Sequence, residues 1–162
     1  MTATLTTLNE FNRPYLKSLI SDVSEEELDL QPQPELHSIR WILAHLCIAI
    51  DYGLKQFDLP FVCSLRWHAA YGPTSAPGTS AKIRPTRDEL LQTIDSGYTL
   101  LCDAMARATL EEMTLVHEVD LLKATPLKTR GDLVGHILTT HFATHLGQLS
   151  SLRRHFGRPP LF

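Results

Sequence analysis

Four long segments with helical periodicity, and no segment with the alternation of a half-buried strand, restrict this chain to an all-α fold. Apolar residues recur at the spacing of one helix face over residues 4–21, 38–57, 86–108 and 129–155. An amphipathic helix of this kind must bury its apolar face against another element. The sequence therefore predicts a four-helix bundle.

Capping motifs indicate where these helices begin and end. Ser38 is expected to cap the second helix, and the capping box Thr86–Glu89 opens the third. Thr129–Asp132 opens the fourth helix, which we expect to run to about His155. A glycine followed by two prolines, in Gly157–Pro160, then ends it. Two further boxes, at residues 24–27 and 109–112, predict short helical turns.

The longest connection spans residues 58–85, between the second and third helices. A connection of this length is usually functional, or it crosses from one end of a bundle to the other. It carries three large side chains that are unusual in a free linker: Trp67, His68 and Tyr71. We therefore expect one domain, residues 1–162, with a non-sequential topology and a long crossover between helices 2 and 3.

Composition excludes several classes of function. A net charge of −3 gives no basic footprint for nucleic acid. There is no apolar run of roughly eighteen residues, so we expect no membrane span. The N-terminus lacks the basic and apolar regions of a signal peptide. Three widely spaced cysteines (Cys47, Cys63 and Cys102) argue against a disulfide framework, and we expect a cytoplasmic protein.

Histidines lie on the apolar faces of the second and fourth predicted helices. His141 and His145 are four residues apart, about one helical turn, on the apolar stripe of the fourth helix. His45 holds the same kind of position on the second helix, flanked by Trp41. A single inward histidine is more often a hydrogen-bonded core residue. Three of them, however, would be explained by one shared divalent metal, whose open coordination positions are typical of a catalytic site.

Other histidine-based sites fit the sequence less well. A zinc protease motif needs glutamate after its first histidine, where Phe142 stands. The chain also has no Glu-x-x-His pair of a di-iron bundle and no Gly-x-Ser-x-Gly turn of a serine hydrolase. His136 is five residues before His141, about 500° of helical rotation, so we expect it to point elsewhere. We also expect no carboxylate in a general-base position beside the three histidines.

Two stretches resemble the signature helices of the DinB-like (YfiT-like) superfamily. The first is SIRWILAHL at residues 38–46, and the second is HFATHLGQL at residues 141–149, which continues to GRPP at residues 157–160. The resemblance extends over essentially the whole chain. It implies a four-helix bundle with up-down-down-up topology that forms homodimers. It also implies that His45, His141 and His145 hold zinc, nickel or a similar divalent ion beside a pocket for a small-molecule substrate.

Characterised members of this superfamily include thiol-dependent transferases and isomerases. We therefore expect a metal-dependent S-transferase, or a related detoxification activity, that uses a low-molecular-weight thiol. A divalent metal on three neutral imidazoles lowers the pKa of a bound thiol or water, and the lack of a general-base carboxylate favours the thiol. The alternatives are a metal-dependent hydrolase and a non-catalytic dimeric protein for stress response or small-molecule binding.

Residues around the three histidines are further candidates for the site. Gln148, three residues after His145, is expected to orient a ligand or to help close a dimer. Gly147 is expected to let another backbone approach closely. Candidate neighbours of the metal or walls of the pocket are Trp41, Tyr52, Trp67, His68 and Tyr71. A plain core or interface role fits each of them as well.

Overall fold

The computed structural model describes residues 2–76 and 82–161. The prediction of an all-α fold is confirmed, since these residues form helices and loops and no strand beyond one isolated bridge, Val116 to Thr129. The elements are α1 (Thr2–Ile20), η1 (Glu27–Asp29), α2 (Ile39–Leu54), η2 (Lys55–Phe57), α3 (Leu65–Tyr71), α4 (Arg87–Arg107), α5 (Leu110–Thr114), η3 (Asp120–Leu122), α6 (Arg130–His136), η4 (Ile137–His141) and α7 (Phe142–His155). None of the helices in this part of the chain has the length and apolar character needed to cross a membrane.

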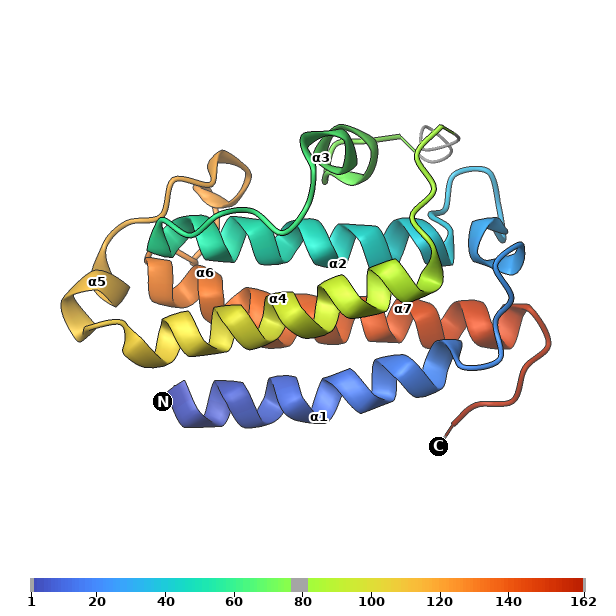
Figure 1. Ribbon diagram of the computed structural model, residues 1–162, viewed down its shortest axis with the longest axis horizontal. Helices are drawn as coiled ribbons and strands as arrows, with labels where there is room; N and C mark the ends of the chain where they lie inside the picture. Colours follow the sequence, from blue (N-terminus) through green and yellow to red (C-terminus); the bar gives the residue numbers. More distant parts are fainter. Residues whose placement is uncertain (1, 77–81, 162) are drawn as a thin grey trace.

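Four long helical pieces lie side by side: α1, α2, α4 and a fourth helix made of α6, η4 and α7 (Figure 1). Figure 1 shows α1 and the fourth helix running in one direction, with α2 and α4 running in the other. This is the up-down-down-up arrangement. Because α2 and α4 point the same way, the crossover of residues 58–85 must carry the chain back along the bundle before α4 begins.

The predicted caps form as the sequence motifs indicate. The Ser38 hydroxyl accepts the backbone N–H of Trp41 at the start of α2. Complete capping boxes, Thr86–Glu89 and Thr129–Asp132, open α4 and α6. Each box satisfies two N–H groups that a helix start leaves unpaired, so these ends are set by local chemistry. After α7, Gly157 takes a φ of 77°, the left-handed conformation that ends helices and favours glycine.

The second helix is buried on all sides, although its sequence pattern predicted a single inward stripe. Every residue of α2 except Tyr52 is buried. The crossover accounts for this difference, because it contains the short helix α3, which packs on the outer face of α2. The Trp41 indole N–H donates to the Ser75 hydroxyl at 2.9 Å and ties the segment after α3 to α2. Residues 77–81 of the crossover lie outside the described residues.

The fourth helix is continuous, but it is not α-helical throughout. Residues Ile137–His141 form one π-helical turn between α6 and α7. A π turn closes its hydrogen bonds from residue i to i+5, so it holds more residues than an α turn and changes which side chains share a face. Such turns occur frequently at functional sites, and this one ends at His141.

An ion-paired clamp joins the end of α1 to the end of the fourth helix. Arg153 of α7 donates to both carboxylate oxygens of Asp22, at 2.5 and 3.0 Å. Arg158 also donates to the Asp22 backbone carbonyl, at 3.1 Å. The hydrogen bond from Arg153 lowers the pKa of the Asp22 carboxyl below its ordinary value of 3.8.

Acid should weaken this clamp, because it protonates Asp22. Because the folded pKa of Asp22 lies below its unfolded value, the clamp stabilises the fold fully above pH 3.8 and loses its effect as the pH falls through the folded pKa. We expect Asp22→Asn to flatten the acid side of a plot of unfolding free energy against pH, measured by urea denaturation. Equal acid-side slopes for the two proteins would contradict the assignment.

Candidate metal centre

Three histidine side chains from two helices meet inside the bundle. His45 comes from α2, His141 from the end of the π turn and His145 from the first turn of α7. The Nε2 atom of His141 lies 3.3 Å from Nε2 of His45 and 3.2 Å from Nε2 of His145. One ring nitrogen from each residue falls within 4.8 Å of the others. The structure thus brings together the three histidines that the sequence singled out.

Hydrogen bonds at the far side of two rings fix which nitrogen faces the cluster. Nδ1 of His45 lies 3.0 Å from the backbone carbonyl oxygen of Tyr71, and Nδ1 of His145 lies 2.7 Å from Oε1 of Gln148. Both oxygens can only accept, so each Nδ1 carries the proton. Each Nε2 is left with a bare lone pair directed at the cluster. Metal-binding histidines are usually held in this way by a carbonyl or carboxylate partner.

All three imidazoles are neutral near pH 7 because their pKa values are lowered. Burial lowers the pKa of His45 to about 4, against a smaller raising effect of the Tyr71 carbonyl. Burial, followed by the charges of His145 and His45, lowers the pKa of His141 to about 3. The pKa of His145 is also lowered by burial, although its bond to Gln148 opposes the shift. Neutral imidazole is the form that binds a metal.

The donor set fits a divalent ion better than it fits hydrogen bonding alone. His141 can donate from Nε2 to only one of its two neighbours, so at least one of these two close contacts has no proton between its nitrogens and is repulsive. A cation at the centre would remove that repulsion. Tetrahedral zinc with Zn–N bonds of 2.0–2.1 Å places its ligand nitrogens about 3.3 Å apart, close to the separations of 3.2 and 3.3 Å found here.

A cavity of about 450 Å³ adjoins the cluster. His45 and His141 form part of its wall, so an ion held there could present its open positions to a bound molecule. The remaining wall combines apolar side chains from α2, the fourth helix and the loop around η3 with a few polar groups. Its polar and charged members include Tyr52, Lys55, Gln56, His68, Glu118, Asp120 and His136.

The structure places the other candidate residues at different distances from the cluster. Trp41 stacks on His45 with ring centres 4.6 Å apart, and Gln148 bonds to His145 as described above. Tyr52 and His68 line the cavity. Trp67 and Tyr71 are not among the residues that line it, and the Tyr71 side chain is fully buried, so Tyr71 acts through its backbone carbonyl.

The expectation that Gly147 permits a close backbone approach is wrong within this chain. Apart from its chain neighbours and the backbone of its own helix, no described atom lies within 4 Å of the position that a Cβ on Gly147 would occupy. Glycine is needed instead at Gly72, which ends α3, because a Cβ there would come within 2.6 Å of the His68 carbonyl oxygen. That tight end helps to direct the Tyr71 carbonyl towards His45.

The prediction that His136 points away from the site is also wrong. Its ring centre lies 5.5 Å from that of His141, and it lines the same cavity. The predicted rotation of 500° assumed a regular α-helix. The π turn between the two residues holds more residues per turn, so positions i and i+5 come close to the same face. The only sign in the sequence that His136 approaches His141 was their spacing of five residues in a helix rich in histidines.

Three carboxylates lie in or next to the cavity wall, but the cluster itself contains only histidines, so the expectation that no carboxylate stands beside the three histidines is not contradicted. Glu118 and Asp120 line the cavity from the loop around η3, and Asp51 of α2 bonds to the cavity-lining His68. The position of Glu118 and Asp120 in the cavity wall could not be predicted, because their segment is not part of the helices that carry the three histidines. Asp51 had a visible signal, since it is an acidic residue within an otherwise apolar stretch of helix.

The bundle and its three-histidine cluster define a class of helical proteins whose core holds a ligand set suited to a metal ion. The family model described as the DinB superfamily matches residues 8–149, and the chain belongs to that superfamily. A solved structure described as a conserved protein from Enterococcus faecalis aligns with a TM-score of 0.78, covers 98% of both chains and shares 16% sequence identity. At that identity the likeness establishes the fold alone. No curated protein matches the sequence.

Proposed function

We propose that this protein is a divalent-metal-dependent enzyme, and specifically an S-transferase that uses a low-molecular-weight thiol. The observation that carries the proposal is the convergence of bare Nε2 atoms from His45 and His145 on His141 beside a cavity. These residues would hold zinc or nickel. When bound, such an ion lowers the pKa of a thiol, so that thiolate is available near neutral pH.

The other residues of the site position the three ligands and shape the cavity. The Tyr71 carbonyl and the Gln148 side chain hold two of the imidazoles in the tautomer that binds metal. Trp41 covers one face of His45. The mixed apolar and polar cavity is of the size that small-molecule substrates occupy. We further propose a cytoplasmic protein that forms a homodimer, as the resemblance to the superfamily implies, with one site in each chain.

A metal-dependent hydrolase is the second candidate. Glu118 in the cavity wall favours it, because its carboxylate could accept a proton from water. A purely non-catalytic binding role gains less support, since the cluster borders a cavity rather than lying sealed in the core. The thiol transferase remains the first choice because of the superfamily to which the chain belongs.

Elemental analysis of protein purified without a histidine tag tests the metal directly. We expect about one zinc or nickel ion per chain, which chelators remove. Low-molecular-weight thiols should then raise the melting temperature of the metal-loaded protein, since a ligand at about 100 times its Kd adds about 2.7 kcal/mol of stability. The metal-free protein serves as the control. Absence of bound metal would contradict the metal proposal, and equal thiol shifts with and without metal would contradict the thiol proposal.

A further inference from the structure

A buried carboxylate outside the histidine cluster is bonded to an imidazole in the cavity wall. Asp51 of α2 is 0% exposed. Its carboxylate accepts the backbone N–H groups of Val62 at 2.7 Å and Cys63 at 3.2 Å, and its Oδ2 lies 2.7 Å from Nε2 of His68. All three partners belong to the crossover. A buried charge is tolerated only when it is paired and hydrogen-bonded in this way.

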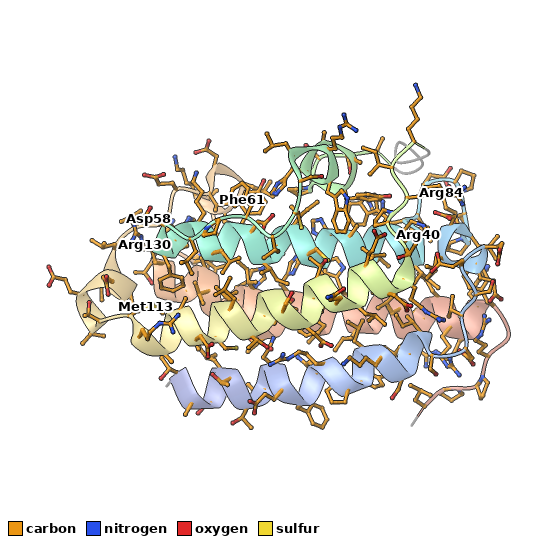
Figure 2. All side chains as sticks on the ribbon, viewed as in Figure 1. Arg40, Asp58, Phe61, Arg84, Met113 and Arg130 are labelled. Atoms are coloured by element: carbon orange, nitrogen blue, oxygen red, sulfur yellow. The ribbon has the colours of Figure 1, made fainter. Side chains whose placement is uncertain are left out.

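The bond to Asp51 determines where His68 carries its proton. A carboxylate oxygen accepts, so Nε2 of His68 is the donor and Nδ1 of the neutral ring is a free acceptor. Among the described residues, Nδ1 of His68 makes no hydrogen bond. Phe61 (labelled in Figure 2) stacks on the ring with centres 5.0 Å apart, and Tyr52 meets it edge-on at 6.2 Å. The ring is therefore held in one orientation.

His68 lines the same cavity as His45 and His141, with its side chain 18% exposed. The short helix α3 connects the two features, since Tyr71, one turn after His68, supplies the carbonyl that orients His45. We propose that Nδ1 of His68 is the general base of this cavity and that Asp51 is a positioning residue that fixes its tautomer. A carboxylate that orients a basic imidazole is a recurrent catalytic arrangement.

The substrate assigned to this base rests on the proposed transferase function. Nδ1 of His68 takes the proton from the S–H group of the thiol. The sulfur electron pair then forms a bond to the electrophilic carbon of the second substrate. The leaving group departs with its bonding electrons and receives the proton from the His68 imidazolium. The sum is a thioether and a protonated leaving group, with His68 neutral again.

Nitrogen-15 NMR of the metal-free protein tests the pair of Asp51 and His68, here called the dyad, without any activity measurement. At a pH where the ring is neutral, we expect the His68 signals to show protonated Nε2 and unprotonated Nδ1. A neutral ring protonated on Nδ1 would overturn the proposal. Asp51→Asn should weaken the tautomer preference, but it can also loosen the crossover, so the spectrum of the unaltered protein carries the test.

Proton release on thiol binding then tests the role of the base. Calorimetry in buffers of different ionisation enthalpy, with zinc-loaded protein and 2-mercaptoethanol, should show little net release, because His68 retains the proton. His68→Gln should release about one proton per thiol, while the exposed control His155→Gln should match the unaltered protein. Equal release from all three would overturn the proposal. If no protein binds the thiol, the proposed function is wrong, and the NMR tautomer alone decides whether the dyad stands.

Discussion

Replacing His145 with alanine is expected to weaken zinc binding by more than about 100-fold, because changes to the partners of a metal ligand alone typically cost 10–100-fold. His145 supplies one of the three converging nitrogens and is buried. The metal-free variant should remain folded, within about 2 kcal/mol of the unaltered metal-free protein. The reason is that, without metal, the three histidines gain little from contacts of which at most one is bridged by the His141 Nε2 proton.

A competition titration with a chelating dye measures the affinity, and circular dichroism measures the fold. His155→Ala is the matched control, since His155 is an exposed histidine on the same helix. Its zinc affinity should be unchanged. Unaltered zinc affinity in His145→Ala would mean that the three histidines are an ordinary hydrogen-bonded core cluster. A variant that unfolds even without metal would mean that His145 has a structural role that the geometry does not predict.

The largest loss of stability is expected from Arg40→Ala. The Arg40 side chain is only 4% exposed, at the start of α2 (Figure 2). It donates to both carboxylate oxygens of Asp29 at 2.8 and 2.9 Å, to the Glu25 carbonyl at 2.8 Å, and to the Pro85 carbonyl. One side chain thus joins α2 to the turn before it and to the end of the crossover. Breaking a buried ion pair costs about 3–5 kcal/mol, and we expect about 3 here because Asp29 remains partly exposed.

Arg84→Ala provides the matched control for this prediction. Arg84 pairs with the same Asp29 carboxylate, but its side chain is 56% exposed. An exposed ion pair contributes only about 0–1 kcal/mol, so the free energy of unfolding, measured in urea, should change little. Similar losses in the two variants would contradict the view that burial of Arg40 determines its contribution.

The helices and their ends were predictable because the information is local. Ser38 and the boxes at Thr86–Glu89 and Thr129–Asp132 satisfy N–H groups within their own first turns. The convergence of His45 with His141 and His145 could also be anticipated, because helical periodicity reports which side chains face inward. The superfamily resemblance added the bundle's topology, which matches the order and direction of the helices (Figure 1).

The all-α fold, the capped helices and the inward direction of the three histidines follow from local patterns of residues. How the histidine cluster is completed depends on tertiary packing. The α-helical period of 3.6 residues gives no sign of a single π turn, so the approach of His136 to His141 could not be predicted. The packing of α3 on α2 brings the Tyr71 carbonyl to His45 and His68 to Asp51. These contacts join residues 17 to 26 positions apart in the chain, and they depend on how the crossover folds back rather than on local preference.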